Sequence, residues 1–172
     1  MALRPVVLYP DPVLLEPTRE VAEVDDDLRR LVDDMVETMH AEPGVGLAAN
    51  QVGDRRRVMV IDLTAGEEPG NVRVFLNPRI VEEEGSQVGE EGCLSFPGIF
   101  EVIRRPERVR FTALDLDMNE IEEVAEGFYA RAVCHEIDHL DGIVFLQRMS
   151  PLKRRLALRK IDKLRRRGEW SA

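Results

Sequence analysis

The sequence predicts an α+β fold in which short antiparallel strands pack around a central helix, with one further helix near each end of the chain. The chain has 172 residues. A domain of this length buries about 70% of the surface that its unfolded chain would expose, so it can form a core without disulfides. Helical spacing of apolar residues occurs near both ends, and strand-like patterns lie between. We find no internal repeat and no long linker, so residues 1–172 are expected to form a single compact domain.

The N-terminal helix is predicted for residues 25–42. Its apolar residues follow the i, i+3, i+4, i+7 spacing of an amphipathic helix: Leu28, Leu31, Val32, Met35, Val36 and Met39. Asp25 and Asp26 are residue types that favour a helix N-cap, and the Pro-Gly pair at 43–44 ends the helix.

Strands are predicted where β-branched residues gather, at 58–63 and 72–81, and where apolar and polar residues alternate, at 108–116. The polar run 117–120 is typical of a hairpin turn, and it leads into a further strand at 121–124. Helical spacing returns at 127–140, which is expected to be the central helix. A last helix is predicted at 151–167.

Composition and charge restrict the possible function classes. The net charge is −9, but residues 150–168 hold nine Lys/Arg and one acid, so this window carries +8 and the remainder −17. An acidic body argues against a general DNA-binding protein. No apolar run approaches the roughly 18 residues that span a bilayer, and the first residues lack a secretory pattern, so we expect a cytoplasmic protein without a membrane partner. Cys93 and Cys134 are then expected to be free thiols or metal ligands.

The most specific local pattern is HEIDH at residues 135–139, which fits H-E-x-x-H. His135 and His139 lie four residues apart, so on a helix both imidazoles face the same side and can bind one metal ion. Glu136 is turned aside from that face, where it could take a proton from a metal-bound water. The alternative is a chance match on an ordinary helix, expected on the order of once in a few hundred chains of this length.

A catalytic metal site of this kind needs a third protein ligand and one open position. The remaining histidine, His40, belongs to the first predicted helix. The only acids downstream of the motif are expected at the surface: Asp141, Asp162 and Glu169. Cys93 is the better candidate because it lies in a tight segment with glycines and a proline, and a thiolate binds soft metals strongly. Considered alone, Cys93 would more often be a buried thiol, which is the role that we assign to Cys134.

A third segment, GVGLAANQ at residues 44–51, combines two glycines with small alanines. Such residues allow a close approach of the backbone to a ligand. A dinucleotide-binding loop is excluded, because the segment follows a helix and its sixth residue is Ala49 instead of glycine. Considered alone, the segment would be a helix end that leads into a packed strand, and Gln51 would be a surface amide.

Taken together, the three segments resemble the motifs of the bacterial peptide deformylases. That family has G-φ-G-φ-A-A-x-Q, E-G-C-L-S and H-E-x-D-H-L in this order, where φ is apolar. The chain matches every fixed position at residues 44–51, 91–95 and 135–140. The similarity extends to YPDPV at 9–13 and SPLK at 150–153, so it covers nearly the whole chain.

The resemblance implies a role for each matching residue. The metal ligands would be Cys93, His135 and His139. The general base and acid would be Glu136, and the formyl oxygen would be polarised by the Gln51 amide and the Leu94 N–H. We expect the substrate to contact Val45, Gly46, Glu91 and Phe128. The family metal is Fe²⁺, one ion per chain, and Zn²⁺, Ni²⁺ or Co²⁺ can occupy the site.

The expected activity is that of a metal-dependent hydrolase that removes the formyl group from the N-terminal formylmethionine of nascent polypeptides. A metal-bound water activated by Glu136 would attack the formyl carbon and release formate. Two alternatives remain at this point. One is a zinc endopeptidase or other amidase, and the other is a metal-binding or ribosome-associated domain without activity.

The basic segment at 150–168 also permits two interpretations. A run of charges is usually a solvated helix face that pairs with an acidic body. A polyanion, however, releases counterions when such a helix binds it. The resemblance implies that the basic C-terminal helix docks on the ribosome near the exit tunnel.

Overall fold

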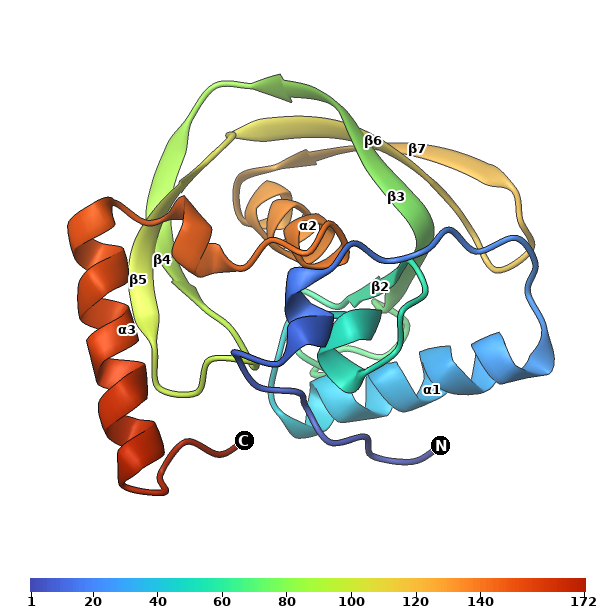
Figure 1. The fold of residues 1–172 in the computed structure, drawn as a ribbon. Coiled ribbons are helices and arrows are strands. Elements are labelled where there is room, and N and C mark those ends of the chain that lie inside the picture. The colour runs from blue at the N-terminus through green and yellow to red at the C-terminus, as the bar shows by residue number, and fades with distance from the viewer.

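Two antiparallel sheets surround the central helix α2 (Gly127–Leu140) in the computed structural model, which describes residues 1–172 (Figure 1). The larger sheet has the strand order β1-β2-β3-β6-β7, and the smaller one pairs β4 with β5. Their bounds are β1 (Gly46–Ala48), β2 (Val58–Ile61), β3 (Arg73–Glu84), β4 (Gln87–Gly92), β5 (Phe100–Arg105), β6 (Arg108–Leu114) and β7 (Glu120–Glu126). The fold is therefore the predicted α+β class, and α2 is the central helix that the sequence predicted.

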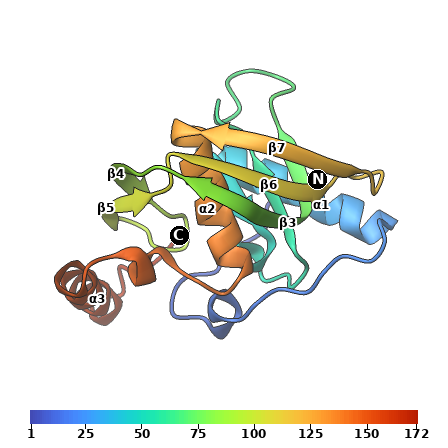
Figure 2. The ribbon, with the colours of Figure 1, turned by 90° about the horizontal axis from the view of Figure 1, so that it is seen from above.

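The two outer helices are α1 (Asp26–Ala41) and α3 (Pro151–Arg166). The Asp25 side chain caps α1 by accepting a hydrogen bond from the Leu28 N–H at 2.8 Å, as its residue type predicted. In the view from above, β3, β6 and β7 cross over α2, and α3 lies beside the smaller sheet (Figure 2). Short 3₁₀ turns occur at Pro12–Leu15, Ala49–Val52 and Phe145–Arg148.

Two strands, β4 and β5, were not predicted from the sequence, whereas β1 is the packed strand that segment 44–51, considered alone, was expected to lead into. β4 reads Gln-Val-Gly-Glu-Glu-Gly, and glycine and glutamate are depleted in strands, so no propensity marks it. The strand pairs with β5, and it follows the long β3, whose pairing with β6 shifts register between Leu76 and Arg79 and again between Ile80 and Glu82. Such bulges bend a strand, and the chain leaves β3 towards the smaller sheet.

The hydrophobic core has three parts, one of which contains α2. One packs α2 under the large sheet, and a second packs α1 against β1 and β2. The third joins the N-terminal segment, the loop after β4, residues 144–149 before α3 and Ile161 of α3, and it contains the fully buried Phe96. None of the helices is both long enough and apolar enough to span a membrane.

Candidate active site

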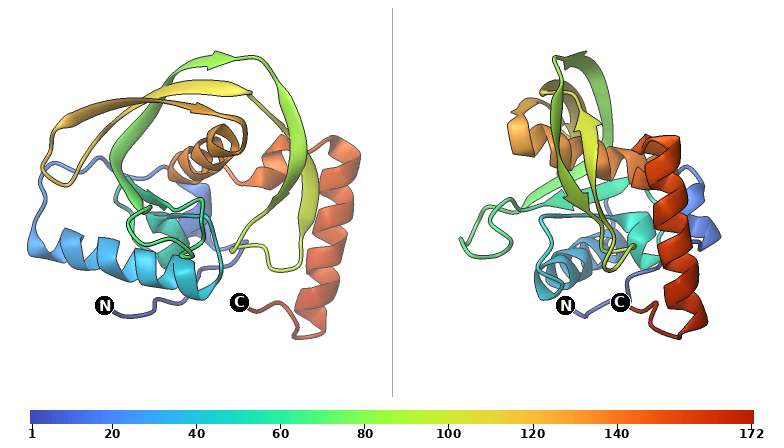
Figure 3. Two further views of the ribbon diagram at one scale, coloured as in Figure 1. Left: turned by 180° about the vertical axis from the view of Figure 1, so that it is seen from behind. Right: turned by 90° about the vertical axis from the view of Figure 1, so that its left-hand side faces the viewer.

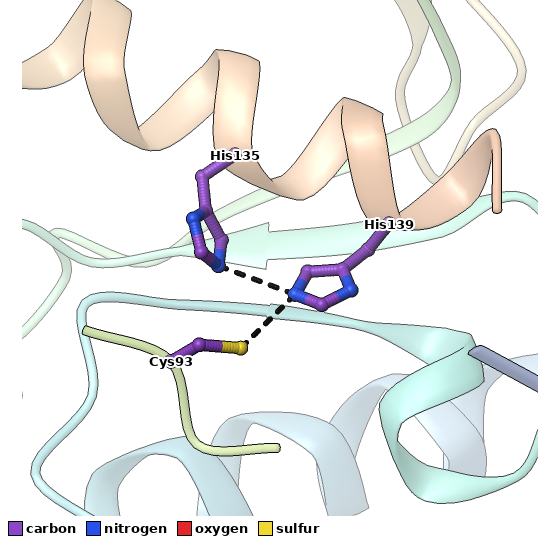
Figure 4. Close-up of side chains that lie close together, drawn as sticks. All are labelled: Cys93, His135 and His139. Carbon is purple, nitrogen blue, oxygen red and sulfur yellow. Dashed lines mark hydrogen bonds between the residues drawn. The ribbon is translucent and has the colours of Figure 1, made fainter. Parts of the chain in front are cut away.

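Three metal-ligating atoms converge between α2 and the loop that follows β4 (Figure 4). His135 and His139 project from one face of α2, a helical turn apart, and their Nε2 atoms lie 3.2 Å from each other. The Cys93 Sγ lies 3.2 Å from the His139 Nε2, although the two residues are 46 positions apart in the chain. All three atoms lie within 4.8 Å of one another, so they can share one ion.

This donor set fits a divalent transition metal. A thiolate with two imidazoles suits zinc or iron, and three protein ligands leave a coordination position open. Burial holds the pKa of His139 well below its usual range, which favours the neutral imidazole that binds metals. The sequence-predicted ligands therefore lie together, and Cys134 lies apart in the core, where burial raises the pKa of its thiol to about 12.

Glu91 orients the first of the two histidines. Its Oε1 accepts a hydrogen bond from the His135 Nδ1 at 2.8 Å, which directs the His135 Nε2 towards Cys93 and His139. Both carboxylate oxygens are held by buried guanidinium groups, because Arg105 donates to Oε1 and Oε2 and Arg131 donates to Oε2 at 2.7 Å. Glu91 borders the cleft, where a substrate contact was expected. Its carboxylate already accepts hydrogen bonds from Arg105, Arg131 and His135, so it is better placed to orient His135 than to bind a substrate.

Glu136 lies beside the three ligands, and no protein group donates a hydrogen bond to its carboxylate. The residue is buried, and its Oε2 has no hydrogen-bond partner. Burial raises the pKa of Glu136 to about 7, because little water solvates its charge. Gly46 on β1 makes room for it, since a Cβ at position 46 would lie 2.7 Å from the Glu136 Oε1. A carboxyl in this state can both accept and return a proton near neutral pH.

Gln51 and Leu94 complete the surroundings of the three ligands. Gln51 is buried, so it is not the surface amide that the segment alone suggested. Its Oε1 accepts a hydrogen bond from the Ala48 N–H at 3.0 Å. Its Nε2 donates to the Ser95 Oγ at 3.2 Å and lies 3.6 Å from the Cys93 Sγ. The motif residues 44–51 and 91–95 thus meet at one place, with the Gln51 amide nitrogen beside Cys93 and Ser95.

A cleft of about 460 Å³ opens onto these groups. The edge strand β1 lies along the cleft, and so do residues of β4 and of the loop after it. The predicted substrate residues Val45, Gly46 and Phe128 all line the cleft, as do Leu94 and Gln51. Phe128 is exposed although it is apolar, so a substrate side chain could cover it.

The ionic network behind the ligands was not predicted from the sequence. Asp138 accepts hydrogen bonds from Arg105 at 2.6 Å and from Arg148 at 2.7 and 2.9 Å. Arg105 thereby links Glu91 to the helix that carries both histidines. Only the motif residues Glu91 and Asp138 gave a sequence pattern for this network, because its arginines come from separate elements that the fold brings together.

The chain is similar to known proteins over nearly its whole length. A family model described as polypeptide deformylase matches residues 3–155. A peptide deformylase of Acidobacterium capsulatum is 50% identical over 170 residues, covering 99% of this chain and 100% of the relative. One from Alkalilimnicola ehrlichii is 51% identical over 168 residues, covering 98% of this chain and 94% of the relative.

Solved structures show the same similarity in three dimensions. A peptide deformylase from Legionella pneumophila superposes with a TM-score of 0.91 at 39% identity, covering 99% of this chain and 100% of that one. The Ehrlichia chaffeensis peptide deformylase in complex with actinonin gives a TM-score of 0.86 at 42% identity, covering 95% of this chain and 98% of that one.

Proposed function

Because the chain belongs to the polypeptide deformylase family, enzymes that remove the formyl group from an N-terminal methionine, we propose that its reaction takes place at Cys93, His135 and His139. The observation that carries this assignment is the convergence of those three ligands beside Glu136, whose Oε2 is free of any protein partner. Formylmethionyl ends of nascent polypeptides are the proposed substrates, and formate is the product.

Cys93, His135 and His139 would hold the metal, which we propose to be Fe²⁺, with Zn²⁺, Ni²⁺ or Co²⁺ able to replace it. When bound, the ion supplies Lewis acidity, which polarises a carbonyl oxygen and makes water a stronger acid. The usual order of affinities favours Zn²⁺ over Fe²⁺ at such ligands, so iron in the site would reflect metal supply.

Glu136 would move the proton. Its raised pKa of about 7 lets the ionised carboxylate take a proton from the attacking water, and the resulting acid can return that proton to the leaving amine. The leaving amine becomes the new N-terminus of the polypeptide.

Gln51 and Leu94 would stabilise the charge that develops on the formyl oxygen. The Gln51 Oε1 is fixed by the Ala48 N–H, so its Nε2 is held in one orientation before the reaction begins. Preorganised donors of this kind contribute about 3–4 kcal/mol each to the stabilisation of a transition state. The backbone N–H of Leu94 is the second proposed donor, since Leu94 follows Cys93 and lines the same cleft.

The substrate peptide would lie along β1. This strand pairs with β2 on one side only, and its other edge borders the cleft, so an extended peptide can add to it as a further strand. Val45 and Phe128 would then contact the methionine side chain. The two apolar side chains match a thioether, which packs well against aliphatic and aromatic groups.

We also propose that α3 contacts the ribosome near the exit tunnel. Lys153 pairs with Glu101 and Arg166 with Asp162, and Lys160 donates to the Gly98 carbonyl. Five exposed cations in α3 or directly after it have no carboxylate partner and no other hydrogen bond: Arg155, Arg159, Lys163, Arg165 and Arg167. A helix with five unpaired cations on an acidic body fits the phosphate surface of an RNA.

Formate release from formyl-Met-Ala-Ser tests the proposed reaction. The protein is purified anaerobically with Fe²⁺, and the variant Glu136→Gln is compared with Glu126→Gln. Glu126 is an exposed residue directly before the same helix, so it controls for the substitution itself. We expect Glu136→Gln to retain metal and lose at least about 100-fold in kcat, the typical contribution of a positioned acid or base. Near-normal turnover by this variant would refute the role of Glu136.

A further inference from the structure

The last residues of the chain turn back from the end of α3 towards the cleft. Gly168 has φ +69°, which lets the backbone reverse at this point. The Glu169 N–H donates to the Leu164 carbonyl at 2.9 Å, and the Gly168 N–H donates to the Arg165 carbonyl at 3.1 Å. This is the Schellman pattern of helix ends, so the return of residues 168–172 has a local cause in the sequence. Figure 3 shows the segment leaving the foot of α3 and ending beside the body of the molecule.

Trp170 anchors this returning segment. Its indole Nε1 donates to the Tyr9 carbonyl oxygen at 2.8 Å. Its ring meets the ring of Phe96 edge-on with centroids 6.4 Å apart, and Tyr9 stacks on Phe96 at 5.0 Å. Phe96 is buried and follows Cys93 by three residues, so the anchor lies against the loop that carries a proposed metal ligand.

The anchored segment reaches the cleft itself. Ala172 lines the same cleft as His135 and Glu136, together with Pro97 and Gly98. The lining residues fall into two groups by burial, because His135 and Glu136 are buried whereas Gly98 and Ala172 are exposed. Residue 172 therefore belongs to the mouth of the cleft. Lys160 fixes α3 to this side of the mouth by donating to the Gly98 carbonyl at 2.7 Å.

We propose that residues 168–172 form a wall at the mouth of the cleft and contact the part of the substrate peptide that follows formylmethionine. The inference rests on the proposed function, since it assumes that a formyl peptide lies in this cleft. The reacting bond has to lie at the buried end, beside Glu136, so the residues after methionine leave through the exposed mouth. The occupant of that mouth is thus an extended peptide, and affinity for it should depend on Trp170 only when the peptide is long enough to reach the wall.

Steady-state kinetics with two substrates tests the wall. Formyl-Met-Ala is compared with formyl-Met-Ala-Ser-Ala for the wild type, Trp170→Ala, Trp170→Phe and the control Glu84→Gln, which alters an exposed residue of β3 outside the segment. For Trp170→Ala we expect a rise of about five-fold in KM for the tetrapeptide, equivalent to about 1 kcal/mol of lost contact. Its kcat, and both constants for the dipeptide, should stay at the wild-type values. Trp170→Phe keeps the ring against Phe96 and should restore most of the affinity.

Two results would overturn the proposal. An equal effect of Trp170→Ala on both peptides, above all on kcat, would mean that the segment only supports the Cys93 loop. Unchanged KM for the tetrapeptide would mean that the segment contacts no substrate. If the wild type released formate from neither peptide, the proposed function would fail instead. The contact between residues 168–172 and a peptide would then be tested by a binding measurement alone.

That binding measurement uses the intrinsic fluorescence of Trp170, the single tryptophan of the chain. The deformylated peptides Met-Ala and Met-Ala-Ser-Ala are added, and quenching by acrylamide is recorded. Trp170 packs on Phe96 and does not line the cleft, so the proposal expects the tetrapeptide to reduce quenching by holding residues 168–172 in place, and the dipeptide to leave the quenching unchanged. Equal quenching with either peptide, at concentrations that saturate the cleft, would count against it.

Discussion

Replacing Glu91 with glutamine tests how the buried ionic network supports the metal ligands. Glu91 accepts four hydrogen bonds, one from His135, one from Arg131 and two from Arg105, at 2.7 to 2.9 Å. Burial alone would raise the pKa of this carboxyl, but the bonds and charges of Arg105 and His135 outweigh burial and hold the pKa well below its usual range. The ionised form is therefore the stable one, and glutamine keeps the shape while it removes the charge.

The magnitude follows from what each partner retains. Removing one member of a buried ion pair costs about 3–5 kcal/mol, because the remaining charge is left uncompensated. Arg105 keeps Asp138 at 2.6 Å, and Arg131 keeps the Ile103 carbonyl at 3.0 Å. We therefore expect the lower end, a loss of about 3 kcal/mol in the free energy of unfolding. Because His135 loses its charged acceptor, metal affinity should fall by about 10- to 100-fold.

The assay is denaturant unfolding of the metal-free protein together with a competition titration of the metal against a chelator. Glu84→Gln is the matched control, because it removes a carboxylate that pairs with Arg108 at 3.1 Å on the surface. Such an exposed pair should change stability by less than about 1 kcal/mol and leave metal affinity as it was. If Glu91→Gln behaved like this control in both measurements, the supporting role of Glu91 would be wrong.

Three further predictions concern the ligands, the glycine beside Glu136 and the basic helix. Cys93→Ser should lose metal during gel filtration while Cys134→Ser retains it, because only Cys93 lies beside the two imidazoles. Equal metal loss in both variants would mean that the two cysteines are wrongly assigned. Gly46→Ala should lower kcat more than it alters metal content, because the added Cβ would lie 2.7 Å from the Glu136 Oε1. The overpacking should lower the free energy of unfolding by about 1–3 kcal/mol. Unchanged kinetics would contradict this contact. A variant with glutamine at five cations should co-sediment less with ribosomes at low salt and still hydrolyse a short formyl peptide: Arg155, Arg159, Lys163, Arg165 and Arg167. Undiminished co-sedimentation would mean that α3 is only a solvated helix and does not contact the ribosome.

The helices and the long hairpin could be predicted from the sequence because their patterns are local. Apolar spacing and an aspartate cap placed α1, and the predicted central helix has the bounds Gly127–Leu140 in the structure. The alternation that predicted a strand at 108–116 corresponds to β6, and the turn at 117–120 leads into β7. Interactions between residues three or four apart, or across a tight turn, depend little on the rest of the chain.

The sequence by itself determined that His135 and His139 face the same side of a helix with Glu136 beside them, because helical geometry fixes residues four apart. It also placed the basic charges of α3 on one segment. Only the tertiary structure brought Cys93 and Gln51 to those histidines. Cys93 follows β4, whose pairing with β5 has no pattern in the sequence, and Gln51 follows β1, which pairs with β2. The same holds for Glu91 and Arg105, and for Trp170 on Phe96. Contacts between distant residues form only when the whole core closes around α2, so their partners cannot be read from the spacing along the chain.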